Sequence, residues 1–251
     1  MNETKPTCFD GLAGTRADAG DTSLPYLRPV AAGTMMIVDG SGAQPRVLMG
    51  RRHEKLAFHP GIYVFPGGRV EASDRRMNVA GALDEHVERR LLCGVKKPSP
   101  QRARAQALAA IRETFEETGL LIGSRDYGAP ENPPEGAWSL YAAQGLFPEL
   151  DRLHLIARAI TPPGRNRRFD TAFFAVDAQD VADRLEDMGG PERELVELVW
   201  LPIEKAGQLD MLPVTRTALL ELAARIEGGM RPYLPVPLYT CPRGIWRREL
   251  L

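Results

Sequence analysis

The sequence has few cysteines, no long apolar run and no excess of charge of either sign. Its three cysteines, Cys8, Cys93 and Cys241, are far apart and form no pair with metal-site spacing, so reduced thiols in a cytoplasmic protein are expected. No apolar run approaches membrane-spanning length and the N-terminus has no apolar signal core, which predicts no membrane partner. With 32 basic and 33 acidic residues, no global basic excess indicates nucleic acid as the main partner.

The length and composition are those of a globular protein with many loops. A chain of 251 residues with 43% hydrophobic content can bury a substantial core, in one large domain or two small ones. The 21 prolines and 24 glycines indicate many loops. Residues 1–25 lack hydrophobic periodicity and are expected to form a flexible arm, followed by a single domain over residues 26–251.

Three glutamates, Glu113, Glu116 and Glu117, stand at positions i, i+3 and i+4, which share one face of a helix. Like charges this close repel one another, and near a helix C-terminus they also oppose the helix dipole. One interpretation is a solvated acidic stripe on a surface helix. The other is a site for a hard divalent cation, which needs several oxygen ligands.

The helix that carries these glutamates has clear boundaries. Ser99 and Pro100 form an N-cap followed by proline at the first helical position, and Gly119 ends the helix. Just upstream, residues 75–98 form a separate charged segment, in which Leu83 to Leu92 is predicted to be a short amphipathic helix. The acidic triplet therefore lies in the last turns of the longer helix.

Residues 30–38 and 46–50 are predicted to form a hairpin of two strands. A third short strand, residues 63–65, leads into Pro66-Gly67-Gly68, where paired glycines let the backbone come close to a ligand or an ion. Glycine pairs are common in turns, so this signal gains weight only from its neighbours.

Two groups of arginines follow or precede predicted strands. Arg51 and Arg52 come directly after residues 46–50, and a basic loop at residues 165–168, which includes Arg168, precedes the strand at 169–176. Each group is either solvated or binds an anionic substrate, because guanidinium groups bind phosphate with two hydrogen bonds.

The last third of the chain is less regular. Residues 178–188 are predicted to form a short helix, residues 195–201 a strand, and residues 215–226 an amphipathic helix. The tail, residues 231–251, is rich in proline.

The glycine turn, the acidic helix and the short strand after it together resemble the Nudix hydrolase family. The signature of that family is G-x5-E-x7-R-E-U-x-E-E-x-G-U, in which U is aliphatic. Its second half matches residues 112–120, with Thr114 at the first aliphatic position. Its first half matches Gly68-x5-Asp74, with aspartate in place of glutamate.

The spacing inside this signature is unusual. Between Asp74 and Arg112 lie 37 residues instead of seven, and the 30 extra residues match the charged segment at 75–98. A long insertion at this point is known in the Nudix branch that includes coenzyme A diphosphatases, and residues 168–174 also look like that branch. The resemblance covers residues 30–205.

The resemblance implies an α/β/α sandwich around a mixed sheet, with a helical insertion inside the signature. It implies a hydrolase that cleaves the pyrophosphate of a nucleoside diphosphate derivative with Mg²⁺ or Mn²⁺. The implied catalytic residues are Glu113, Glu116 and Arg112, with Glu113 as a ligand or a base and Arg112 orienting the carboxylates. The implied metal ligands are Gly67 through its carbonyl, Glu113, Glu116, Glu117 and a later carboxylate, for which Glu197 is chosen over Glu194 and Glu192.

The implied substrate comes from a second pattern upstream of the glycine turn. Coenzyme A-cleaving members resemble L-L-T-x-R-[SA]-x3-R-x3-G-x3-F-P-G-G, and this chain keeps every spacing. The matching residues are Leu48, Arg52, Gly61 and Phe65-Pro66-Gly67-Gly68, and the differing residues are Met49, Gly50, His53 and Ala57. Arg51, Arg52 and Arg168 are expected to bind the substrate.

A coenzyme A or acyl-coenzyme A substrate is therefore favoured. ADP-ribose, NADH and other dinucleotides stay open as substrates, and so does a non-catalytic ligand-binding module with this fold. A homodimer stays open as the oligomeric state.

Overall fold

The computed structural model describes residues 11–18, 20, 21, 23–56, 58–186 and 194–251. Three positions considered above, Cys8, Ala57 and Glu192, lie outside the described residues.

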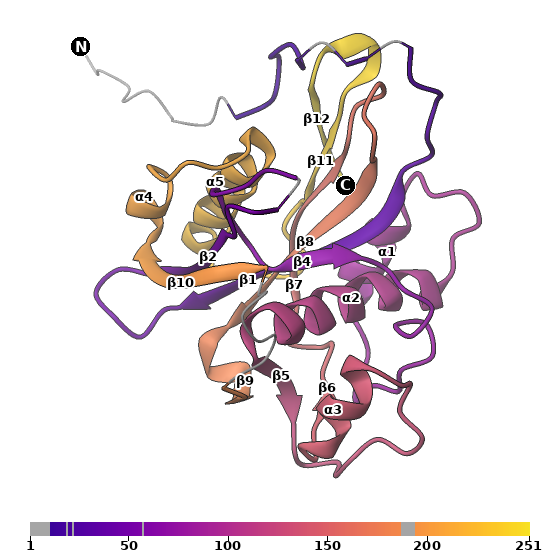
Figure 1. Ribbon diagram of the computed structural model, residues 1–251, viewed down its shortest axis with the longest axis vertical. Coiled ribbons are helices and arrows are strands. Elements are labelled where there is room, and N and C mark those ends of the chain that lie inside the picture. The colour runs from indigo at the N-terminus through magenta and orange to yellow at the C-terminus, as the bar shows by residue number, and fades with distance from the viewer. Residues whose placement is uncertain (1–10, 19, 22, 57, 187–193) are drawn as a thin grey trace.

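A mixed sheet of nine strands forms the middle layer of the molecule (Figure 1). Its main order is β10-β2-β1-β8-β7-β11-β12, while β3 pairs with β2 and β4 pairs with β1. The pairs β1–β8 and β7–β11 are parallel and the other pairs are antiparallel. The bounds are β1 Val30–Asp39, β2 Arg46–Arg52, β3 Tyr63–Val64, β4 Gly67–Arg69, β7 His154–Ile160, β8 Phe169–Asp177, β10 Leu195–Pro202, β11 Pro237–Thr240 and β12 Arg247–Leu250.

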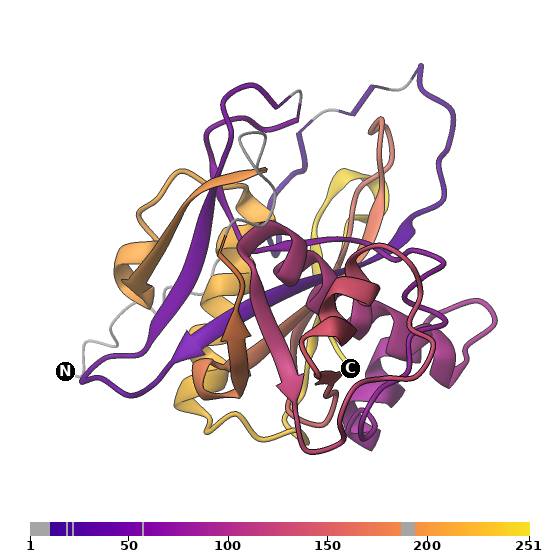
Figure 2. The same ribbon diagram turned by 60° about the horizontal axis from the view of Figure 1, so that its bottom comes forward.

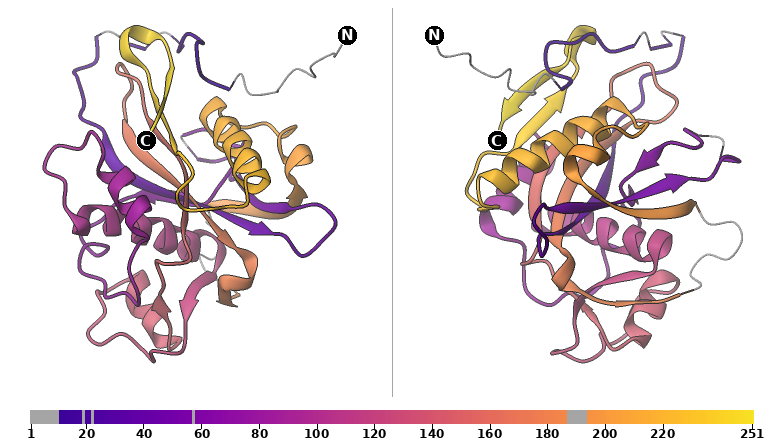
Figure 3. Two further views of the ribbon diagram at one scale, coloured as in Figure 1. Left: turned by 180° about the vertical axis from the view of Figure 1, so that it is seen from behind. Right: turned by 90° about the vertical axis from the view of Figure 1, so that its left-hand side faces the viewer.

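Helices cover both faces of this sheet, as the two views of Figure 3 show. The central strand β1 explains why, because its side chains alternate between the faces. Met35 and Ile37 pack with α2, whereas Met36 and Val38 pack with α5. The helices are α1 Glu85–Leu92, α2 Pro100–Thr118, α3 Ala137–Ala143, α4 Ile203–Ala206 and α5 Pro213–Glu227. The predicted α/β/α sandwich with a mixed sheet is confirmed.

The segment between Asp74 and α2 is packed into the same core as α2. Asp84 caps α1 by accepting a hydrogen bond from the His86 backbone N–H at 2.8 Å, and Leu91 is fully buried. Beyond the helix, Arg158 donates to the Cys93 carbonyl at 2.6 Å. The predicted helix in this segment is present and begins slightly later than expected.

A second, smaller sheet lies at the C-terminal end of α2, where α3 also packs (Figure 2). It consists of β5 Leu120–Ser124, β6 Phe147–Pro148 and β9 Val181–Arg184. The prediction of a helix over residues 178–188 is wrong within the described residues. Only a 3₁₀ turn, Ala178–Asp180, precedes β9, because β5 has an edge whose backbone groups need a partner and β9 pairs with it.

The ends of the chain also join the sheet layer. The Pro-rich tail contains the hairpin of β11 and β12, which extends the sheet through β7. Near the N-terminus, Leu12 is buried in the α5-side core and Arg16 forms a β-bridge with Ile245. Within the described residues no helix combines the length and the apolar character that crossing a membrane requires.

Candidate active site

The C-terminal half of α2 lies directly against the glycine turn. Ser99 caps the helix and Gly119, at φ 76°, ends it in the left-handed conformation. The approach is close enough to demand glycine, because a Cβ at Gly68 would overlap the Glu113 carboxylate. At Gly67 a Cβ would lie 2.6 Å from the Gly33 carbonyl oxygen. The glycine pair therefore brings the backbone of β4 beside the acidic face of α2.

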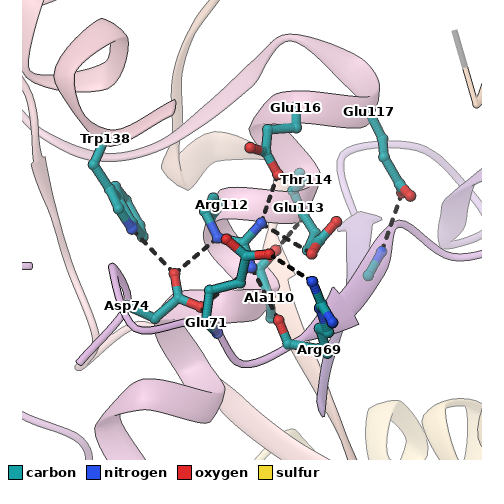
Figure 4. Close-up of polar contacts among 11 residues, drawn as sticks. Arg69, Glu71, Asp74, Ala110, Arg112, Glu113, Thr114, Glu116, Glu117 and Trp138 are labelled. Atoms are coloured by element: carbon teal, nitrogen blue, oxygen red, sulfur yellow. Dashed lines mark hydrogen bonds and ion pairs between the residues drawn. The ribbon is translucent and has the colours of Figure 1, made fainter. Parts of the chain in front are cut away.

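Arg112 is the hub of this face (Figure 4). Its side chain is 4% exposed, and its Nη1 lies 2.6 Å from Glu116 Oε2 and 2.9 Å from Glu113 Oε1. Its Nη2 also donates to the Arg69 carbonyl at 3.0 Å. The pairing expected between Arg112 and Glu116 is therefore present, and Glu113 shares the same guanidinium nitrogen.

Asp74 holds the other side of Arg112, although 37 residues separate them in the sequence. Arg112 Nε donates to Asp74 Oδ1 at 2.8 Å and Nη2 donates to Oδ2 at 3.2 Å. The fully buried carboxylate also accepts hydrogen bonds from Trp138 Nε1 at 3.0 Å and from the Glu71 backbone N–H at 2.8 Å. The aspartate that replaces the signature glutamate is thus fixed by four donors.

Three residues of this cluster, Asp74, Trp138 and Glu71, were not among the predicted site residues, although Asp74 was matched to the signature. Trp138 comes from α3, and no sequence signal in that helix points to the acidic face. Burial raises the pKa of the Glu116 carboxyl, and the nearby charge of Glu71 raises it further. Glu71 also pairs with Arg69 at 3.5 Å. Its position three residues before Asp74, directly after the glycine turn, is the signal that could have found it.

The carboxyl groups of α2 are held partly out of water, and this governs their pKa values. Burial raises the pKa of Glu113 to about 7, against the lowering effect of Arg112. Burial also raises the pKa of Glu116. For Glu117, burial and the charges of Glu194 and Glu113 raise the pKa well above its usual range, although its carboxylate accepts the Gly67 N–H at 3.1 Å.

Burial disfavours the charge on Arg112, but its carboxylate neighbours favour it more. The hydrogen bond to Asp74 and the charges of Glu113, Asp74 and Glu116 raise the pKa of Arg112 above its ordinary value. This one cation faces three carboxyl groups, so the cluster holds more acidic groups than the guanidinium can neutralise when all are ionised.

The donor chemistry of this cluster fits a hard divalent cation, because all the side-chain donors are carboxylate oxygens. The side chains as they stand are turned to other partners: Glu113 and Glu116 to Arg112, and Glu117 to Gly67. Across the described part of the chain, no three His, Cys, Asp or Glu side chains are already grouped to hold a metal ion. Metal binding here therefore requires rotation of glutamate side chains on a fixed helix.

The later carboxylates lie beside the first pair of arginines. Arg51 Nε donates to Glu197 at 2.8 Å, and Tyr63 donates to the same carboxylate at 3.2 Å. The hydrogen bond from Arg51 keeps the pKa of Glu197 below its usual value. Arg52 pairs with Glu194, whose charge acts on Glu117. Of the predicted substrate-binding residues, Arg51 is thus bound to Glu197, the predicted late metal ligand, and Arg52 is bound to Glu194.

A cavity of about 260 Å³ lies between Glu117 of the acidic face and Glu197 of the sheet edge. Glu117 and Glu197 both line it, and Arg184 adds a positive charge. Most of the surface exposed to the cavity is polar, although six lining residues are apolar: Leu48, Leu120, Leu195, Val196, Leu198 and Trp200. The cavity can accept a partly apolar ligand beside the acidic face.

Arg168 lies in a different setting. Its guanidinium donates to the carbonyls of Thr161 at 2.9 Å and Leu27 at 2.6 Å, and it stacks over the Tyr26 ring at 4.9 Å. These partners do not include any residue of the acidic face. The role of Arg168 in substrate binding stays a prediction, and its present contacts hold the N-terminal segment against the start of β8.

The chain is similar in sequence and in structure to several known proteins. No family model matches the chain. It is 30% identical over 174 residues to the acyl-coenzyme A diphosphatase NUDT19 of Gallus gallus, covering 49% of this chain and 46% of that protein. It is 24% identical over 258 aligned positions to the Homo sapiens protein of the same name, covering 78% of this chain and 68% of that protein. The chain thus spans about half the length of the chicken relative.

Among solved structures, a Nudix hydrolase from Alicyclobacillus acidocaldarius superposes with a TM-score of 0.58 at 28% identity, covering 81% of this chain and 96% of that one. The resemblance to Nudix hydrolases of the coenzyme A diphosphatase group is confirmed by these similarities in sequence and structure. The proteins that the chain resembles, acyl-coenzyme A diphosphatases and a Nudix hydrolase, are enzymes of the predicted class.

Proposed function

We propose that this protein hydrolyses the pyrophosphate bond of a nucleoside diphosphate derivative, with Mg²⁺ or Mn²⁺ bound at the acidic face of α2. The observation that carries the proposal is the convergence on Arg112. Glu113, Glu116 and Asp74 meet one buried guanidinium beside the glycine turn, although Asp74 lies on the far side of a long insertion. Those are the residues that match the Nudix signature.

Each residue of the acidic face has a proposed role. Glu116 and Glu117 would hold the metal together with the Gly67 carbonyl, and Glu113 would be either a further ligand or the base. A divalent cation bound there supplies charge neutralisation of phosphate oxygens and a lower pKa for bound water. As the base, the Glu113 carboxylate would accept a proton from the attacking water. In the metal-free protein burial raises the pKa of this carboxyl to about 7. Arg112 orients the glutamates.

Substrate binding is proposed for the neighbouring edge. Arg51 and Arg52 are only half-buried and lie at the end of β2, so an anionic ligand can compete for them with Glu197 and Glu194. Either glutamate, once released, is a proposed additional metal ligand, with Glu197 preferred because it lines a cavity with Glu117. Arg168 is kept as a third proposed substrate residue.

Coenzyme A or an acyl-coenzyme A is the preferred substrate class. The named relatives are acyl-coenzyme A diphosphatases. The cavity beside Glu117 offers both charged groups and apolar side chains, such as Leu48 and Leu198, which an acyl arm can contact. ADP-ribose or NADH would use the same pyrophosphate chemistry without an apolar arm. A non-catalytic ligand-binding module is the other alternative. A cytoplasmic location and a homodimer stay predictions.

The test is a hydrolysis assay of the purified full chain across coenzyme A, an acyl-coenzyme A, ADP-ribose, NADH and a diadenosine polyphosphate. Each substrate is tested with Mg²⁺, with Mn²⁺ and with a chelator. We expect metal-dependent cleavage of the coenzyme A substrates into adenosine 3′,5′-bisphosphate and a phosphopantetheine product. Preferred cleavage of ADP-ribose would change the substrate class, and binding without cleavage of any substrate would favour the ligand-binding module.

A pair of variants connects the activity to α2. Glu116→Gln is expected to lower turnover by about 10²–10³-fold, because it removes one proposed metal ligand. Glu85→Gln on α1 is the matched control, since it changes an exposed helical glutamate outside the cluster. Circular dichroism melts of both variants establish that any loss is not a loss of folding.

A further inference from the structure

Helix α3 has a direct connection to the acidic face of α2. Its residues Trp138 and Tyr141 are both fully buried, and each donates one side-chain hydrogen bond. The Trp138 indole N–H donates to Asp74, whereas the Tyr141 hydroxyl donates to the Ile122 carbonyl. The two rings pack edge to face at 5.5 Å, and Tyr141 packs against Phe115 of α2 in the same way. The helix thus packs on α2 through Tyr141 and Phe115, and it binds Asp74, the partner of Arg112, through the Trp138 indole.

The hydrogen bond from Trp138 acts on the residue that sets the direction of Arg112. Asp74 Oδ1 accepts from Trp138 Nε1 and from Arg112 Nε, while Oδ2 accepts from Arg112 Nη2 and the Glu71 N–H. With all four donors in place, the carboxylate has one orientation. Its only donor from outside the signature segment is Trp138, among the hydrogen bonds of the described residues.

The planarity of the guanidinium passes this orientation on. Because Nε and Nη2 of Arg112 are fixed on Asp74, Nη1 can point in only one direction, which is toward Glu113 and Glu116. If Asp74 turned about its χ2 angle, the guanidinium would turn with it and Nη1 would leave the glutamates. The position of two proposed metal ligands therefore depends on the rotamer of a carboxylate that Trp138 fixes.

We propose that Trp138 is a positioning residue for the metal site, acting through Asp74 and Arg112. Aspartate is one methylene shorter than the glutamate of the signature, and the indole N–H supplies the outer contact that fixes this shorter side chain. The inference rests on the proposed function, because it concerns the alignment of the proposed metal ligands. It assigns a role to the segment after the signature that neither the signature nor the relatives' names describe.

The competing explanation is that Trp138 only fills the core. Two substitutions on α3 separate these explanations: Trp138→Phe removes the indole donor, and Tyr141→Phe removes the other buried donor of the same helix. Both keep an aromatic ring, so both are expected to cost some stability. Only Trp138→Phe is expected to weaken Mn²⁺ binding, by about three- to ten-fold, because it alone loosens Asp74.

Mn²⁺ binding to the full chain is measured by electron paramagnetic resonance of free Mn²⁺, and stability by urea unfolding. If both variants bind Mn²⁺ equally well, the positioning role is wrong and Trp138 is a core residue. If the wild-type chain neither binds Mn²⁺ nor hydrolyses any dinucleotide, the proposed function fails instead. The two failures are thereby distinguished by the wild-type protein.

A measurement on the intact tryptophan covers the case in which Trp138→Phe does not fold. The chain has three tryptophans, so its ¹⁵N spectrum holds three indole signals. Substituting Trp200 and Trp246 by phenylalanine in turn identifies the Trp138 signal by elimination. We expect this signal to exchange slowly with solvent and to shift on Mg²⁺ addition more than the Trp246 signal. An unshifted Trp138 signal at saturating Mg²⁺ would overturn the proposal.

Discussion

Two buried arginines of this protein bind an aspartate through the same pair of guanidinium nitrogens. Arg158 Nε and Nη2 each lie 2.6 Å from the Asp170 carboxylate, and Arg112 Nε and Nη2 lie 2.8 and 3.2 Å from Asp74. Both arginines are almost fully buried, with side chains 2% and 4% exposed. Geometry at the aspartate therefore does not distinguish the two sites.

The third nitrogen of each guanidinium distinguishes them. Arg158 Nη1 donates to the neutral Cys93 carbonyl, so Asp170 is the one anion bound to this cation and their charges cancel. Arg112 Nη1 meets Glu113 and Glu116 while the other two nitrogens bind Asp74, so one cation meets three carboxylates. A single buried ion pair of this kind stabilises a tertiary contact, whereas several carboxyl groups around one cation need either protonation or a further cation.

The largest expected difference is in turnover. Replacing either arginine by lysine keeps the charge but removes the planar pair of donors, and should destabilise the fold by roughly 1–3 kcal/mol. Folded Arg112→Lys should turn over about 100-fold more slowly, while folded Arg158→Lys should stay within about two-fold of wild type. Steady-state kinetics at saturating metal, with urea unfolding of each variant, measure both effects. An equal loss of turnover would remove the distinction between the sites.

Metal should stabilise the Arg112 site and leave the Arg158 site unaffected. At 100 times its Kd, Mn²⁺ is expected to raise the free energy of unfolding by about 2.7 kcal/mol, and a chelator should reverse this. Glu117→Gln should remove most of the increment. Asp170→Asn is the control, because it weakens the fold at the other buried arginine and should keep the full increment. Thermal melts with and without Mn²⁺ provide the comparison.

The pH dependence of stability sharpens the same contrast. The pKa of Glu113 is raised from 4.5 to about 7 in the folded protein, so within this range the folded state binds more protons than the unfolded state. Without metal, this group's contribution to stability is present below pH 4.5 and is lost as the pH rises toward 7. Glu113→Gln should reduce this loss of unfolding free energy between pH 4.5 and 7 by roughly 1–3 kcal/mol. Unfolding free energies at several pH values test it, and an unchanged slope contradicts it.

The smallest expected effect on stability is at the edge of the sheet. Arg51 and Glu197 form a solvent-exposed ion pair, so Glu197→Gln should change the unfolding free energy by less than about 1 kcal/mol. If Glu197 joins the metal site during turnover, the same substitution should still raise the metal concentration needed for half-maximal activity. Activity titrations with Mg²⁺ measure this, and Glu85→Gln again serves as the exposed control. An unchanged requirement would leave Glu197 as a partner of Arg51 alone.

The local features of the site could be predicted from the sequence. The spacing of Glu113, Glu116 and Glu117 determines their shared helix face, and Gly119 determines where that helix ends, because both follow from helical geometry and from one residue's backbone freedom. The nearly continuous apolar sequence of β1 likewise suits a strand with core on both faces of the sheet. Relations of this kind involve residues a few positions apart.

The relations between distant segments were decided by tertiary structure. Trp138 meets Asp74 across 64 positions of sequence, and no periodicity encodes that contact. The strand β9 formed where polar composition had indicated a helix, because the edge of β5 needed a partner. Arg168 turned to backbone carbonyls, and Arg51 and Arg52 turned to glutamates, since nearby acceptors compete for any guanidinium. The sequence determined which side chains can do chemistry. Tertiary packing decided which of these side chains meet at Arg112. A buried charge needs opposite charges and hydrogen-bond partners, and the fold determines which groups lie close enough to provide them.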